Sequence, residues 1–183
     1  MPRVLVLVLA ILATLPLERA EADGLIVYGS GFAFTVSEPP GWIGDTKAAA
    51  TLGANIIFYR RGETAVRSKA LIRVLVADKV DENTVADLES DERDYRQRYP
   101  KVIFKDIALS HAEYKTYPKL FCVPGEFYEY VTYLNPGPTR PLLLSVSMNT
   151  QKEPATAEEW KTYHSIVSSL NFIGGPTVHH KRE

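Results

Sequence analysis

The sequence is poor in the features that usually reveal a chemistry. It has one cysteine, Cys122, among 183 residues, so it cannot form an internal disulfide. The neighbouring Leu120, Phe121 and Val123 are typical of a strand, which favours a buried thiol that behaves as a small hydrophobe. The alternative for a lone cysteine in an oxidising compartment is a reactive thiol.

Motifs of hydrolases and metal centres are also missing. The chain has neither a G-x-S-x-G nor an H-E-x-x-H motif. Its four histidines are His111, His164, His179 and His180, and none has a third partner at metal-ligand spacing. We therefore expect no catalytic residues, no metal and no cofactor, and an enzyme is only the third hypothesis.

The chain has no excess of either charge and only one long apolar run. It carries 21 basic and 22 acidic side chains, which argues against nucleic-acid binding. The run from Val4 to Leu17 is too short to span a membrane, and Ala20-Glu21-Ala22 follows it as a cleavage site. These features predict a signal peptide over residues 1–22, cleaved after Ala22, and a periplasmic or secreted protein that does not span the membrane.

The remaining chain has the length of one domain, over residues 23–175, followed by a flexible tail at 176–183. Alternating and helical patterns in this domain predict the following elements. Strands are expected at 31–37, 54–61, 70–77, 102–109, 112–123, 126–134 and 141–149, and helices at 45–52, 84–99 and 156–170. The strands at 54–61 and 70–77 are expected to pair.

The strand at 126–134 carries aromatic residues on both faces. Tyr128 and Tyr130 point one way, whereas Phe127 and Tyr133 point the other way. A sheet with one wet face does not usually look like this, so helices are expected on both faces. The order of elements therefore predicts an α+β fold with an antiparallel-rich sheet in an α/β/α sandwich.

Two motifs carry a resemblance to a known family. F-x-F-x-V-x-x-P-x-G-W spans Phe32 to Trp42, and E-E-W-K-x-Y-x-x-I-V-x-S-L-x-F spans Glu158 to Phe172. With the helix at 84–99 between them, the chain over residues 25–173 resembles the Mog1/PsbP-like fold. The resemblance implies an α/β/α sandwich and a non-catalytic binding or assembly module of a bacterial envelope. It carries over no functional residue.

A basic segment is the first candidate site. From residue 60 to residue 73 there are five basic side chains and one acidic one, Glu63. The candidate partner-binding residues are Arg60, Arg61, Arg67, Lys69 and Arg73. Such a group can orient an acidic partner, and the alternative is a solvated turn. The segment 78–94 has a net charge of −6, and Asp87, Asp91 and Asp94 share one helix face, which is expected to be solvated.

A second candidate site is a ligand groove lined by Trp42, Tyr128 and Tyr130, since tyrosine is favoured at interfaces. The alternative is that these rings belong to the core. Together, the observations favour a non-catalytic exported binding or accessory module that associates with a cell-envelope protein or complex. The alternative is a small-ligand, lipid or metal-binding periplasmic protein.

Overall fold

The computed structural model describes residues 23–82 and 84–174, so the predicted leader (1–22) and tail (176–183) lie outside it. The strands are β1 (Asp23–Gly29), β2 (Phe32–Glu38), β3 (Trp42–Asp45), β4 (Ile56–Arg60), β5 (Leu71–Asp78), β6 (Ile103–Asp106), β7 (Lys115–Val123), β8 (Phe127–Asn135), β9 (Leu142–Asn149) and β10 (Asn171–Gly174). The helices are α1 (Thr46–Thr51), α2 (Val85–Arg98) and α3 (Ala157–Ser169). The fold is therefore α+β and rich in sheet, as predicted.

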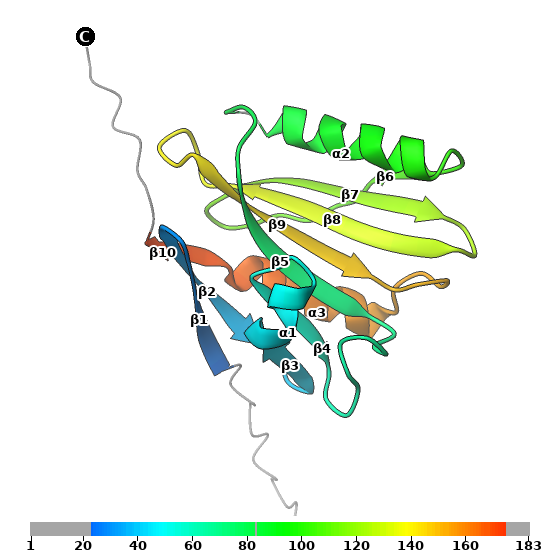
Figure 1. Cartoon of the computed structure of the whole chain (residues 1–183), viewed down its shortest axis with the longest axis horizontal. Coiled ribbons are helices and arrows are strands. Elements are labelled where there is room, and N and C mark those ends of the chain that lie inside the picture. The colour runs from blue at the N-terminus through cyan, green and yellow to red at the C-terminus, as the bar shows by residue number, and fades with distance from the viewer. Residues whose placement is uncertain (1–22, 83, 175–183) are drawn as a thin grey trace, which may run out of the picture.

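The strands form two antiparallel sheets rather than the single sheet expected (Figure 1). The larger sheet has seven strands in the order β3-β4-β5-β9-β8-β7-β6, and β4 pairs with β5 as predicted. The smaller sheet has the order β1-β2-β10, so its outer strands come from opposite ends of the described chain. The two sheets approach closely at Gly44, where a Cβ atom would lie 2.6 Å from Leu25 Cδ1.

The two longer helices, α2 and α3, pack on different apolar clusters. On α3, Tyr163, Ile166 and Val167 are buried in the main cluster, together with Val146 and Met148 of β9. On α2, Leu88 and Tyr95 pack against a second cluster, which contains Phe121, Val131, Tyr133 and Leu143. The aromatic residues of β8 lie on two faces, as predicted. Tyr128 and Tyr130 contact the main cluster. Phe127 and Tyr133 contact the second cluster.

Local capping signals explain two of the helix starts. Asp45 caps α1 by accepting from the backbone N–H of Ala48 at 2.8 Å, and Thr156 forms a capping box with Glu159. The N-cap residue of α2 makes no side-chain capping hydrogen bond. Thr84 holds the N-cap position with a φ of 61°, but its Oγ1 accepts from Asn135 Nδ2 at 2.8 Å instead of capping the helix.

Three strands were not expected from the sequence. β1 has no strict alternation of polar and apolar residues, and β3 and β10 have only four residues each. Trp42 directly follows a turn, begins β3 and has a buried side chain. In β10, Phe172 is buried and Ile173 is exposed.

Candidate functional site

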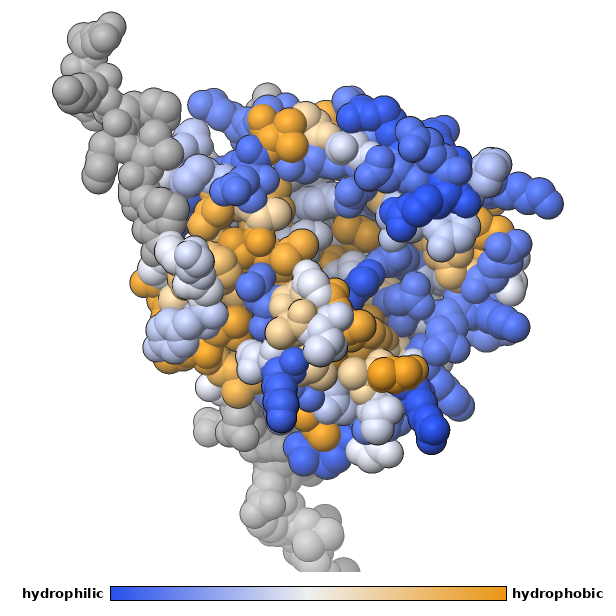
Figure 2. Space-filling view, in the orientation of Figure 1, coloured by the Kyte–Doolittle hydropathy of each residue, from blue (hydrophilic) through white to orange (hydrophobic). Residues whose placement is uncertain are grey.

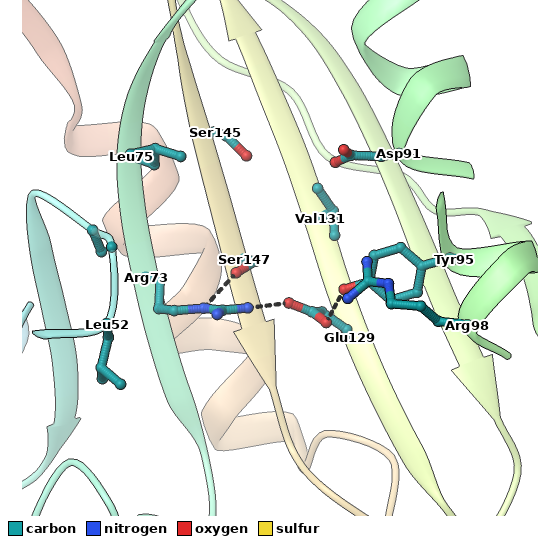
Figure 3. Close-up of a pocket in the computed structure, with 12 residues that line it drawn as sticks. Leu52, Arg73, Leu75, Asp91, Tyr95, Arg98, Glu129, Val131, Ser145 and Ser147 are labelled. Carbon is teal, nitrogen blue, oxygen red and sulfur yellow. Dashed lines mark hydrogen bonds and ion pairs between the residues drawn. The ribbon is translucent and has the colours of Figure 1, made fainter. Parts of the chain in front are cut away.

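A polar groove crosses the face of the larger sheet that carries α2. Strands β5, β9 and β8 form its floor, while α2 and the turn after α1 form its two sides (Figure 3). The cavity has a volume of about 290 Å³. Its lining residues are Leu52, Gly53, Ala54, Arg73, Leu75, Asp91, Tyr95, Arg98, Glu129, Val131, Ser145 and Ser147.

The groove exists because β9 has small polar residues on this face. Ser145 and Ser147 alternate with Leu144 and Val146, whose side chains are buried on the opposite face under α3. A serine side chain is too short to fill the space between α1 and α2. The middle of the sheet is therefore left open on the α2 side while its other side is closed by core packing.

Glu129 is the centre of the polar network in the groove. Its side chain is only 7% exposed, and its Oε1 accepts from Arg73 Nη2 at 2.5 Å. The other carboxylate oxygen, Oε2, accepts from the hydroxyl of Tyr95 on α2. Arg73 Nε also donates to Ser147 Oγ at 3.2 Å, so Arg73 reaches from β5 across β9 to β8 (Figure 3). Both oxygens of a buried carboxylate are thus satisfied.

The environment of Tyr95 fixes its protonation state. Burial raises the pKa of Tyr95, and the nearby Glu129 carboxylate raises it further. Tyr95 therefore remains a neutral hydrogen-bond donor to Glu129 at physiological pH. Arg73, Glu129 and Tyr95 therefore form one hydrogen-bonded network that joins β5, β8 and α2.

A second acidic group lies at the other end of the groove. Asp91 on α2 accepts a hydrogen bond from the hydroxyl of Tyr133 on β8. Burial raises the pKa of Asp91, although the hydrogen bond from Tyr133 acts in the opposite direction. The expectation of a solvated face through Asp87, Asp91 and Asp94 is therefore wrong for Asp91, whose side chain is directed toward the sheet (Figure 3).

Arg98 lies at the mouth of the groove. Its guanidinium carbon stands 4.6 Å from the centroid of the Tyr95 ring, and its Nε donates to the backbone oxygen of Asp94 at 3.4 Å. Within residues 23–82 and 84–174, no carboxylate forms an ion pair with Arg98. By contrast, the charge of Arg73 is compensated by Glu129.

The structure separates the basic residues of the first candidate site. Arg60 pairs with Glu158 at 2.8 Å and lies 5.4 Å from the centroid of the Trp42 ring. Arg61 lies 3.6 Å from Glu38, and Arg73 belongs to the groove described above. Only Arg67 and Lys69 are exposed on the β4–β5 connection without an ion pair among the described residues. Partner binding by the five residues stays a prediction, but they do not form one patch.

The aromatic residues of the second candidate site lie in the core. Trp42 is 1% exposed and Tyr130 is 8% exposed, and both belong to the main cluster. Tyr128 is partly buried against the same cluster. None of the three lines the groove beside α2. The observed groove is on the opposite face of the sheet.

The cysteine and the histidines of the described chain do not form a site together. Cys122 is buried, as expected. His111 accepts at Nδ1 from the backbone N–H of Tyr114 at 3.0 Å, and its Nε2 donates to the carbonyl of Leu170. His164 is exposed. His179 and His180 lie outside the described residues, within which no group of three or more His, Cys, Asp or Glu could hold a metal ion.

Sequence reasoning missed Tyr95, Arg98, Glu129, Ser145 and Ser147 as residues of one site. The signal for the two serines was present, since they interrupt an apolar strand at alternate positions. The signal for Arg73 was similar, because it stands between Ile72 and Val74 on a strand. These residues lie together because of the order of the strands in the sheet. Local sequence patterns do not predict that order.

Comparisons with known proteins give a likeness to solved structures. No family model matches the chain, and no curated protein matches it. Among solved structures, the chain is similar to the solution structure of cyanobacterial PsbP (CyanoP) from Synechocystis sp. PCC 6803. The identity is 15%, the match covers 84% of this chain and 95% of that chain, and the TM-score is 0.48. No residue role is transferred from this likeness to the present chain.

Proposed function

We propose that this protein is a non-catalytic, exported binding or accessory module that associates with a cell-envelope protein or complex. We further propose that its architecture is an α/β/α sandwich, since α2 and α3 pack on separate apolar clusters. Export rests on the apolar leader and its Ala20-Glu21-Ala22 cleavage site. None of the helices in the described part of the chain is long and apolar enough to span a membrane.

The observation that carries the proposal is the unprotected edge of the smaller sheet. Among the described residues, β1 is the longest edge strand, with seven residues, whereas β3, β6 and β10 have four each. β6 carries Lys105 and Asp106, and the pairing of β10 is interrupted by a register shift. Proteins protect edge strands with charges, bulges or short length, and residues 24–29 of β1 have none of these features.

The outer face of β1 also exposes large apolar side chains. Ile26 is 51% exposed and Tyr28 is 75% exposed, and Ile173 of β10 is 53% exposed on the same small sheet. Figure 2 shows apolar side chains on the side of the molecule where β1, β2 and β10 lie. A strand edge with apolar flanks fits an extended segment of another protein, which would add a strand through backbone hydrogen bonds.

Site-specific photo-cross-linking in the native host tests this proposal. A photo-reactive amino acid at position 28 is expected to trap one defined envelope protein, while the same probe at exposed Val66, on the β4–β5 connection, traps none. The purified partner should then bind the wild-type chain and lose about tenfold in affinity or more for a protein with Ile26→Ser and Tyr28→Ser. The matched control is Val66→Ser, whose site is 89% exposed.

The same assay distinguishes the two candidate surfaces. If the partner dissociates when Arg61→Glu and Arg67→Glu are introduced but tolerates the changes on β1, the basic connection is the contact. Equal cross-linking at positions 28 and 66, with no defined partner at either, overturns the proposal of an accessory module.

A further inference from the structure

Helix α2 is docked on the larger sheet in a different way from α3. None of its fourteen residues, all of which the structure describes, is buried, whereas five of the thirteen residues of α3 are. Leu88 and Tyr95 provide its apolar contacts with the second cluster. Because buried apolar side chains supply most of the free energy that holds a helix on its domain, α2 is docked less firmly than α3.

Polar side chains provide further attachment of α2. Tyr95 and Asp91 are hydrogen-bonded to β8 as described above, and Glu92 Oε1 accepts from Lys119 Nζ of β7 at 2.8 Å. Water replaces such partners when they separate, so each contact makes a small net contribution to the docking of the helix.

Two buried polar atoms of this interface have no hydrogen-bond partner among the described residues. They are Asp87 Oδ2, in the first turn of α2, and the hydroxyl of Tyr117, which packs beside the second cluster. An unsatisfied buried polar atom is costly, and both atoms gain access to water when the helix leaves the sheet. The groove also leaves one side of α2 open, along Asp91, Tyr95 and Arg98 (Figure 3). Both features lower the cost of separating α2 from the sheet.

The chain on either side of α2 is held on the sheet independently of the helix. Before the helix, Thr84 is fully buried and accepts a hydrogen bond from Asn135 of β8. After the helix, β6 pairs with β7, and the ring of Phe104 packs against that of Phe121 with centroids 5.0 Å apart. Both attachments can persist while α2 moves, so the helix can separate and return without unfolding of the sheet.

We propose that α2 is a detachable cover, which leaves the larger sheet as a unit while both sheets and α3 stay folded. Its departure exposes the second cluster, formed by Phe121, Val131, Tyr133 and Leu143. A released helix of this length is only marginally stable in water, so the segment also loses its helical hydrogen bonds while it is open. This inference goes beyond the accessory role proposed above and does not depend on it.

Native-state hydrogen exchange of the ¹⁵N-labelled full chain, followed by NMR at low urea concentrations, tests the proposal. Relative to their rates in an unfolded chain, the amides of residues 89–98 are expected to exchange about tenfold or more faster than those of residues 161–169 in α3. Their exchange should also respond less to urea, because local opening exposes less surface than global unfolding. The amides of β8 should follow those of α3.

Two substitutions separate local opening from global unfolding. Tyr163→Phe removes hydrogen bonds that the open and closed forms share, so it should lower the protection of α3 about fivefold or more and leave that of α2 unchanged. Lys119→Met removes a contact that only the closed form makes, so it should lower the protection of both helices by the same factor. The matched control is Lys161→Met, which changes an exposed lysine of α3 and should alter neither.

Two results would overturn the proposal. One is equal protection and equal urea dependence for the amides of α2 and α3. The other is a loss of protection in α2 that matches the loss in α3 when Tyr163→Phe is introduced, since α2 would then open only by global unfolding. Because Ile26 and Tyr28 are not involved, these results are independent of the partner test on β1.

Discussion

Arg73 and Glu129 form an ion pair across a strand that belongs to neither of them. Arg73 is on β5 and Glu129 on β8, and the 2.5 Å contact passes over β9 at Ser147. The contact is possible because the side chain at position 147 is short and accepts a hydrogen bond from Arg73 Nε. The pair therefore couples three strands at the centre of the larger sheet.

A double-mutant cycle should detect this coupling. Glu129→Gln leaves Arg73 without its partner, and Arg73→Met leaves a buried carboxylate. We expect each change to lower the free energy of unfolding by about 1–3 kcal/mol, with a coupling energy of about 1 kcal/mol or more. These values are reduced because Arg73 is 38% exposed and partly screened by water. Urea unfolding gives the free energy of unfolding of the wild type, the two single variants and the double variant. Purely additive effects of the two substitutions would contradict the coupling.

Asp91 should make stability depend on pH in a defined direction. Burial raises its pKa in the folded state above the reference value of 3.8, so the folded state holds more protons between these two pKa values. Stability contributed by this group therefore falls as pH rises through that window. Asp91→Asn keeps an oxygen for the Tyr133 hydroxyl but removes the charge. The variant should be more stable than wild type at about pH 7 and equal to it at about pH 3.

The control for Asp91 is Asp94→Asn, which changes an exposed carboxylate on the same helix. Urea unfolding of both variants across the pH range should show the pH-dependent difference for Asp91→Asn alone. A difference of the same size for both variants would indicate a general charge effect of the acidic helix.

The buried hydroxyl of Tyr163 should stabilise the folded protein. The side chain is fully buried, and its hydroxyl lies 2.9 Å from Thr132 Oγ1 and 3.0 Å from the carbonyl oxygen of Val146. Tyr163→Phe removes both hydrogen bonds at a fully buried position and should lower the free energy of unfolding by about 1–2 kcal/mol. Tyr28→Phe changes a tyrosine that is 75% exposed, and thermal unfolding should show no effect of that substitution.

Cys122 should be unreactive in the folded protein. It is 1% exposed in β7 and packs as a small apolar residue. A thiol reagent such as Ellman's reagent is expected to modify it only after urea unfolding, because the reactive thiolate requires access to solvent. Rapid modification under native conditions would show that β7 opens or that the thiol is activated.

The sequence was sufficient to predict most helices and strands, but not which of them contact one another. Alternation along Leu142 to Asn149 reveals a strand with one apolar face, and the Thr156–Glu159 capping box places the start of α3. These are local signals. The pairing of Arg73 with Glu129 requires β9 to lie between β5 and β8, which is a non-local choice.

Trp42 shows the same limit for a single residue. Its position after Pro39-Pro40-Gly41 indicates a turn, and the turn is present, since the Trp42 N–H donates to the Pro39 carbonyl at 3.0 Å. Trp42 is covered by Arg60 and belongs to a main cluster whose members come from distant parts of the chain. An aromatic residue beside a turn therefore could not be assigned to a groove or to the core from the sequence alone.

The position of β9 has a consequence for how the chain folds. β3 to β5 and β6 to β8 can each form from neighbouring segments, but they join only when residues 142–149 insert between them. Likewise, β2 completes its pairing only with β10, near the end of the described chain. Such long-range contacts slow folding. During synthesis, neither sheet can therefore be completed until residues 142–149 and 171–174 have been made.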